Sequence, residues 1–346
     1  MNFFPGGDMS KSRIFFISVF IALIGLNSQA FAGIKELKQE INEAKQRYAE
    51  VVTQSGKMSE EAHEARSELI DSLFDFKKFV PALPYLRDSW AWIEQEGIKG
   101  REKGRTRSRL GKALRVAGYF EESLPLLEKA CEITADKKGE QSRPAIKRCI
   151  DYGITLSQLG RYDEGIEHLG KQLEYSEVLF GGEHPRTAYA NMQLGSAYQR
   201  AGRSTEAKKH LRDALEIFLS KKGSAFRLTN LTRFKLAKVF RSQGKYDKAE
   251  RVLRKAYVDF AAKKSNQEHQ LAFHLMTYLG RVLKEQGRYV EAEQLLKEGI
   301  EGKKIVLGVD SAKTIQTMLT LAAIYLDQKK SKQAEKIMLE IGRAHV

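Results

Sequence analysis

The sequence has few of the residues that cross-link a chain or carry out catalysis. Only two of its 346 residues are cysteine, six are proline and two are tryptophan. Two cysteines exclude a small disulfide framework and a zinc site built from paired cysteine motifs. The seven histidines are scattered, and no HExxH, GxSxG, phosphate-binding loop or CxxC motif occurs. We therefore expect no enzyme activity, no cofactor and no metal site.

Long apolar runs are scarce as well. The one clear run, Ile14 to Leu26, follows Lys11 and Arg13 and precedes Ala30-Phe31-Ala32. This order is typical of a secretory signal peptide, and the run is too short to cross a bilayer as a helix. We expect residues 1–32 to be a signal peptide and the mature chain to be exported, either to a periplasm or as a secreted protein.

Small residues recur at a nearly constant interval through the rest of the chain. Successive members of the series are 41 to 43 residues apart: Ile70, Gly111, Gly153, Gly195, Ala237, Gly280 and Ala322. A fixed period of this size is the signature of a solenoid, in which each repeat packs mainly on its neighbours. Such a protein usually presents an extended surface to a partner.

Each period reads as two amphipathic helices with apolar residues three and four apart. A glycine follows the first helix in five periods, where a left-handed backbone is required: Gly118, Gly160, Gly202, Gly244 and Gly287. An alanine recurs in the second helix: Ala207, Ala249, Ala292 and Ala334. We expect the small residue of the first helix and this alanine to let two backbones approach closely.

These motifs resemble the tetratricopeptide repeat, in the longer form found in kinesin light chains. The segments Gly287-Arg-Tyr-Val-Glu-Ala-Glu-Gln-Leu-Leu296 and Leu179-Phe-Gly-Gly-Glu-His-Pro185 carry the resemblance most clearly. It implies an all-α fold, a right-handed α-α superhelix of about seven helix-turn-helix repeats over residues 60–340. It also implies that His184 serves a structural turn between repeats.

The two end repeats depart from the pattern, as capping repeats do. The first has Ile70 and Lys77 at its small and turn positions, and the seventh has Lys329 and Ser331 where a glycine and an aromatic residue are usual. The adjacent asparagines of kinesin light chains are also missing, and only Asn191 lies nearby. The peptide-backbone clamp of that family is therefore not expected in its usual form.

Two segments flank the repeats. Residues 33–57 are expected to form an amphipathic helix, which we favour as a cover for the first repeat over a short coiled coil. Residues 341–346, Ile-Gly-Arg-Ala-His-Val, back-translate to a widely used sequencing-adapter read. We expect this segment to be a non-native sequence scar and the true reading frame to be truncated near Glu340.

Basic residues outnumber acidic ones, 59 to 44, for a net charge of +15. The resemblance implies a concave binding surface built from the first helix of each repeat, and helical geometry places four positions of each such helix on one stripe. The partner-binding residues predicted on or beside it are Arg105, Lys112, Arg115, Lys147, Tyr189, Arg200, Phe234, Lys238, Arg241, His274, Arg281 and Lys284. The alternative is a generally basic, solvated surface with no particular ligand.

The two cysteines, Cys131 and Cys149, are expected at neighbouring helix ends in consecutive repeats. A disulfide in an oxidising compartment and two buried free thiols are both compatible with that spacing.

We expect a scaffold that binds another protein through an extended, acidic segment held in a basic groove. Nucleic acid is not an expected partner, because an exported chain seldom meets it. An anionic envelope polymer or lipid is the alternative ligand, and the repeats of a truncated multidomain protein are the alternative architecture.

Overall fold

The computed structural model describes residues 27–75, 78–262 and 270–343, and within these ranges the chain is entirely helical, with no strand. It divides into two compact units, residues 1–78 and residues 79–346. Residues 1–26, which hold most of the predicted signal peptide, lie outside the described ranges, so its removal stays a prediction.

The first unit contains α2 (Asn27–Ser55) and α3 (Glu60–Asp75), which pack against each other. Ile41 and Ala44 of α2 are buried. Arg66 of α3 is fully buried; its guanidinium donates a hydrogen bond to the Lys57 carbonyl at 2.6 Å and lies 5.7 Å from the centre of the Tyr48 ring. Helix α2 begins six residues before the start of the predicted segment 33–57 and ends two residues before the end of that segment.

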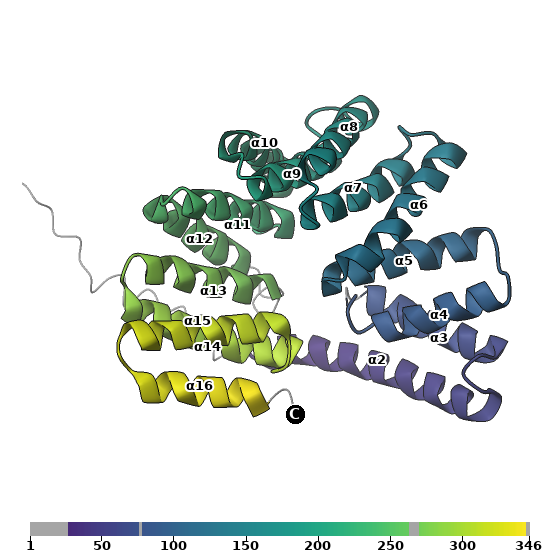
Figure 1. Ribbon diagram of the computed structural model, residues 1–346, viewed down its shortest axis with the longest axis horizontal. Coiled ribbons are helices and arrows are strands. Elements are labelled where there is room, and N and C mark those ends of the chain that lie inside the picture. Colours follow the sequence, from purple (N-terminus) through teal and green to yellow (C-terminus); the bar gives the residue numbers. More distant parts are fainter. Residues whose placement is uncertain (1–26, 76–77, 263–269, 344–346) are drawn as a thin grey trace, which may run out of the picture. The chain divides into compact units, whose positions relative to one another are not determined.

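The second unit has thirteen described helices: α4, and then six pairs from α5 to α16 in which the chain reverses direction (Figure 1). Their bounds are α4 (Leu83–Gln95), α5 (Arg101–Ala117), α6 (Phe120–Lys138), α7 (Arg143–Gln158), α8 (Tyr162–Phe180), α9 (Pro185–Arg200), α10 (Ser204–Lys222), α11 (Arg227–Ser242), α12 (Tyr246–Ala261), α13 (Gln270–Glu285), α14 (Tyr289–Leu307), α15 (Ala312–Asp327) and α16 (Ser331–Arg343). From α5 onward, every odd-numbered helix is the first of a repeat and every even-numbered helix is the second.

The predicted first repeat does not lie within one unit. Its two helices, α3 and α4, are divided between the first and second units. The remaining six repeats, α5 to α16, all belong to the second unit. They keep the predicted period, since the first helices α7, α9, α11, α13 and α15 begin at residues 143, 185, 227, 270 and 312.

The small residues of the first helices make the close contacts expected of them. A Cβ atom built on Gly111, Gly153, Gly195 or Gly280 would come within 2.9 Å of a leucine side chain on the second helix of the same repeat. At Gly195 the neighbours are Leu211 at 2.9 Å and the Ala207 carbonyl at 3.2 Å. A larger residue would therefore push the paired helices apart.

The turns between paired helices follow the glycine pattern. All five predicted turn glycines have positive φ, for example 76° at Gly202. In the seventh repeat Lys329 occupies this position with φ of 59°, and it is the one non-glycine residue with positive φ among the described residues. The degenerate last repeat therefore keeps the backbone geometry without the residue best suited to it.

The connections between repeats are also built alike. His184 caps α9, its Nδ1 accepting a hydrogen bond from the Arg186 amide at 3.0 Å, which is the structural role implied for it. Three threonines one turn into the following helix donate to the carbonyl of the preceding loop glycine: Thr187 to Gly181, Thr229 to Gly223 and Thr314 to Gly308, at 2.8 to 2.9 Å. These bonds tie the loop to the first turn of α9, α11 and α15.

The two cysteines are joined. A disulfide links Cys131 in α6 to Cys149 in α7, with Cα atoms 4.7 Å apart, so a covalent bond connects the second repeat to the third.

In the described residues, none of the helices is both sufficiently long and sufficiently apolar to cross a bilayer.

Candidate partner-binding surface

The first helices form the inner layer of the second unit. Contacts between first helices of neighbouring repeats recur from α5 to α15, and the second helices make no comparable contacts among the described residues. A layer whose members touch across repeats is the more tightly curved one. Side chains of the first helices that point away from their paired helix therefore gather on this inner face.

Cations from separate repeats influence one another on the inner face. Burial lowers the pKa of Lys112 in α5; the Asp151 carboxylate opposes this shift, and Arg115, Lys147 and Arg227 add to it. Arg227 begins α11, three repeats after Lys112. Coulombic coupling over this distance in sequence requires the two helices to bring their charges close together in space.

The centre of this group is Lys235 of α11. Burial lowers the pKa of its ammonium to about 7, and the positive charges of Arg200, Lys238 and Arg115 lower it further. Burial likewise lowers the pKa of Lys238, with Arg200, Arg281 and Arg241 contributing. Five successive repeats, those of α5, α7, α9, α11 and α13, thus contribute positive charge to this face. We call Lys112, Lys147, Arg200, Arg227, Lys235, Lys238 and Arg281 the inner-face cations.

Three predicted cations have carboxylate partners that the sequence interpretation missed. Each pairs with an acidic residue on the next first helix: Arg115 with Asp151 at 2.9 Å, Arg241 with Glu285 at 2.8 Å, and Lys284 with Asp327 at 3.0 Å. All three stand four residues after the small residue of their helix. That position faces the neighbouring repeat, so these side chains bridge repeats.

No carboxylate within ion-pair distance is recorded for the inner-face cations in the described part of the chain. Lys112 lies 4.7 Å from the centre of the Phe79 ring, and Arg281 lies 5.5 Å from that of Tyr278. Aromatic faces compensate a cation only in part. The positive charge of these side chains is therefore only partly compensated.

The two predicted aromatic residues differ in role. Tyr189 of α9 is half-buried near the charged group, and burial raises the pKa of its hydroxyl to about 12, with Asp151 adding to this effect and Arg115 opposing it. Phe234 of α11 instead packs edge-on against Tyr278, with ring centres 5.0 Å apart. Tyr189 can therefore contact a ligand among the cations, and Phe234 supports the helices beneath them.

Two further predicted residues, Arg105 and His274, lie on the first helices α5 and α13. Arg105 is exposed on α5, and His274 is half-buried on α13. Residues that the prediction missed include Arg227 and Lys235. Lys235 stands two residues before Ala237. This position is not one of the four that define the predicted stripe, but it lies next to the stripe on the same face of the helix.

A second cationic position, also missed, lies near Arg281. Lys303 of α14 is only 4% exposed, and its Nζ donates hydrogen bonds to the hydroxyls of Thr277 at 3.0 Å and Thr317 at 2.7 Å. Burial lowers its pKa to about 8, with Lys313 and Arg281 adding to the effect. Lys303 was not predicted because it lies on a second helix, and the predicted stripe includes only positions of first helices.

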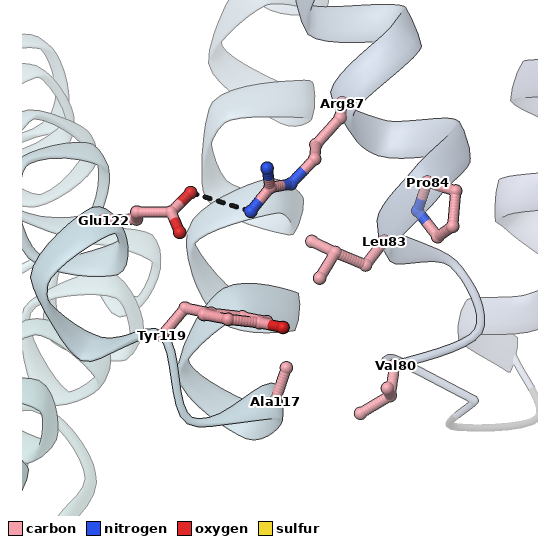
Figure 2. Close-up of a pocket in the computed structure, with 7 residues that line it drawn as sticks. All are labelled: Val80, Leu83, Pro84, Arg87, Ala117, Tyr119 and Glu122. Carbon is pink, nitrogen blue, oxygen red and sulfur yellow. Dashed lines mark hydrogen bonds and ion pairs between the residues drawn. The ribbon is translucent and has the colours of Figure 1, made fainter. Parts of the chain in front are cut away.

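A shallow depression on α4, α5 and α6 is a separate feature of the second unit. Figure 2 shows Leu83 of α4 pointing toward Tyr119, and Arg87 reaching across to Glu122 at 2.8 Å. Both members of this ion pair are about half exposed. The charge here is already paired and solvated, so the depression lacks the uncompensated charge of the inner face.

The fold and this surface define a helical-repeat protein with an interaction face. A tetratricopeptide-repeat profile matches residues 147–220 and 268–340, and a second tetratricopeptide-repeat profile matches residues 232–260. Together they span about half of the sequence. The chain belongs to the tetratricopeptide-repeat family, whose members bind other proteins.

Two solved structures share this fold. The apo form of RapI is similar with a TM-score of 0.57 and 17% identity, over 82% of this chain and 97% of that chain. The Cut9–Hcn1 complex of the APC/C is similar with a TM-score of 0.51 and 16% identity, over 86% and 55% of the two chains. A Podosopora anserina protein described as a kinesin light chain with nearly identical repeats has a TM-score of 0.49 and 20% identity, over 58% and 94%. No curated protein sequence matches the chain.

Proposed function

We propose that this protein is a scaffold that binds an extended, acidic segment of another protein along its inner face. The observation that supports the proposal most strongly is Lys235, a half-buried ammonium with Arg200, Lys238 and Arg115 around it. Holding these cations together costs free energy in the unbound chain. A carboxylate-rich ligand offsets that cost by forming charge-assisted hydrogen bonds.

The repeat architecture favours an extended ligand. The inner-face cations come from α5, α7, α9, α11 and α13, so a bound segment would have to run along several repeats to reach them all. Helices fixed to one another by ion pairs and threonine bonds present these groups with little ordering on binding. Tyr189 supplies a partly apolar contact within the same surface.

The test is a charge-reversal experiment with a matched control. The inner variant carries Arg200→Glu, Lys238→Glu and Arg281→Glu. The outer variant carries Lys209→Glu, Lys248→Glu and Arg251→Glu, which are exposed positions on the second helices. Both variants change the net charge equally. Helicity is checked by circular dichroism, and binding of a labelled Asp/Glu-rich peptide with two apolar residues is followed by fluorescence anisotropy.

The inner variant is expected to weaken peptide binding by at least about a hundredfold, because it removes several charge-assisted hydrogen bonds worth about 1.5–3 kcal/mol each. The outer variant should change binding little. Equal losses in the two variants would contradict a specific surface and indicate attraction by net charge alone. Binding to anionic vesicles that is as sensitive to the inner reversals as peptide binding would point to an envelope lipid instead.

We also propose that the chain is exported, as its amino-terminal sequence predicts. The disulfide between Cys131 and Cys149 supports this, because such bonds persist mainly in oxidising compartments. Cell fractionation combined with thiol labelling of the unfolded, unreduced protein tests it. Recovery in the cytosolic fraction with two reactive thiols would rule it out.

A further inference from the structure

A histidine lies beside the disulfide, in the second helix of the third repeat. Cys131 of α6, Cys149 of α7 and His168 of α8 each offer one ligand atom, and the three atoms lie within 4.8 Å of one another. Both cysteines are buried and His168 is half-buried. Three consecutive helices therefore bring two sulfur atoms and one imidazole nitrogen to a single point.

The next repeat shows what this histidine position does elsewhere. One repeat later, His210 occupies the position of His168, and Asn191 occupies that of Cys149. There the Nδ1 atom of His210 pairs with the Oδ1 atom of Asn191 at 2.9 Å, and the ring stacks on Tyr198. In that repeat the asparagine side chain is therefore the hydrogen-bond partner of the histidine ring.

In the repeat of His168 the asparagine is replaced by a cysteine. The Nε2 atom of His168 is buried and has no hydrogen-bond partner, and Tyr152 meets the ring edge-on at 5.0 Å between centres. A buried polar atom without a partner carries a desolvation cost and calls for an explanation such as a bound ion. The ring of His168 also forms a hydrogen bond with the Cys149 backbone, so Nε2 is the one ring nitrogen without a partner, and a metal cation can supply it.

The ligand set selects the class of cation. Two thiolates and one imidazole, with a water molecule as the fourth ligand, are a set that open Zn²⁺ sites use, whereas closed structural sites take four protein ligands. Bonds of about 2.3 Å to sulfur and about 2.1 Å to nitrogen place tetrahedral ligand atoms roughly 3.4 to 3.8 Å apart. The three ligand atoms of the chain lie within 4.8 Å of one another, so reduction has to separate the two sulfur atoms before they can bind one cation.

We propose that Cys131, Cys149 and His168 form a redox-gated site for Zn²⁺, closed in the disulfide form and open after reduction. A dithiol reductant supplies two electrons and two protons; the Sγ–Sγ bond breaks, two thiols form, and the reductant becomes a disulfide. Zn²⁺ binding then releases both thiol protons and forms two Zn–S bonds and one Zn–N bond. The site is independent of the inner-face cations.

The experiment uses Co²⁺ as a spectroscopic probe of the full-length chain. The reduced protein is expected to bind one Co²⁺ per chain and to show a thiolate-to-cobalt charge-transfer band with the visible bands of tetrahedral coordination. The oxidised protein should show neither, and this comparison needs no variant. Reduced protein that stays folded by circular dichroism and gives no charge-transfer band would overturn the proposal.

Paired histidine variants test the third ligand. His168→Ala should weaken Co²⁺ binding by at least about tenfold, since even groups that only support a ligand contribute that much to metal affinity. His210→Ala, the equivalent change one repeat later, should leave the affinity unchanged. Unchanged affinity in His168→Ala would overturn the assignment of this histidine as a ligand.

Discussion

Replacement of Lys235 by methionine is expected to stabilise the folded chain and to weaken its binding of acidic peptides. Methionine keeps the length of the side chain and removes a charge that the inner face holds at a cost. Burial and three neighbouring cations bring the pKa of Lys235 from 10.5 to about 7, so the folded chain disfavours its protonated form. The substitution therefore separates stability from binding.

The size of the effect follows from the pKa. Each pH unit between the two pKa values corresponds to about 1.36 kcal/mol, which gives a ceiling of roughly 5 kcal/mol for a group fully removed from water. Lys235 is only half-buried by its accessible surface. Solvent screens such a group, so we expect a gain of about 1–2 kcal/mol at pH 6.

The gain must depend on pH in a definite direction. Between pH about 7 and 10.5 the unfolded chain keeps the Lys235 proton that the folded chain has released, so wild-type stability rises with pH in this window. Below pH 7 the full penalty is present, and above pH 10.5 it vanishes. The advantage of the methionine variant should therefore be largest at pH 6 and nearly absent above pH 10.5.

Urea unfolding followed by circular dichroism at several pH values measures this difference. Lys248→Met, at an exposed position on α12, is the matched control and should change stability little at any pH. The reasoning fails if Lys235→Met destabilises the chain at pH 6, or if its effect is the same at pH 6 and pH 10. Anisotropy with the acidic peptide should show weaker binding by the Lys235 variant alone.

Three further predictions concern the scaffold. Gly195→Val should lower the free energy of unfolding by about 1–3 kcal/mol, because the valine side chain would meet the paired helix. Gly170→Ala should raise the free energy of unfolding by up to about 1 kcal/mol, because a Cβ atom there has nothing within 4 Å. Denaturant unfolding that ranks the two variants in the other order contradicts the packing argument. Lys329→Gly should stabilise the last repeat by roughly 0.5–1 kcal/mol, since it relieves a left-handed lysine, and hydrogen exchange of α16 should slow accordingly. Reduction of Cys131 and Cys149 should cost about 3 kcal/mol for the loop they close, and an unchanged urea midpoint after complete reduction would show that the bond does not stabilise the fold.

Much of the fold could be predicted from the sequence, because the packing rules of a solenoid repeat themselves. Gly195 must be small where two helices nearly touch, and Gly202 must turn the chain, so both recur at the same offset in most repeats. The division between α3 and α4 could not be predicted in this way. It falls in the degenerate first repeat, where Ile70 and Lys77 carry no such constraint.

The candidate surface was predictable only in part. Helical geometry places Lys238 and Arg281 on the right face, because direction around a helix follows from sequence spacing. Spacing says nothing about which cation meets a carboxylate from the next repeat, so the pairing of Arg115 with Asp151 was missed. It also does not reveal curvature, which brings Arg227 near Lys112 from three repeats away.

The disulfide between the second and third repeats has a mechanical consequence. In a solenoid pulled from its ends, repeats detach one after another, each adding its length to the extended chain. Cys131 and Cys149 are covalently joined, so the eighteen-residue separation between them cannot add to that length. Under load the repeats on either side of the disulfide would extend, but the segment between Cys131 and Cys149 would extend only after a reductant had broken the bond.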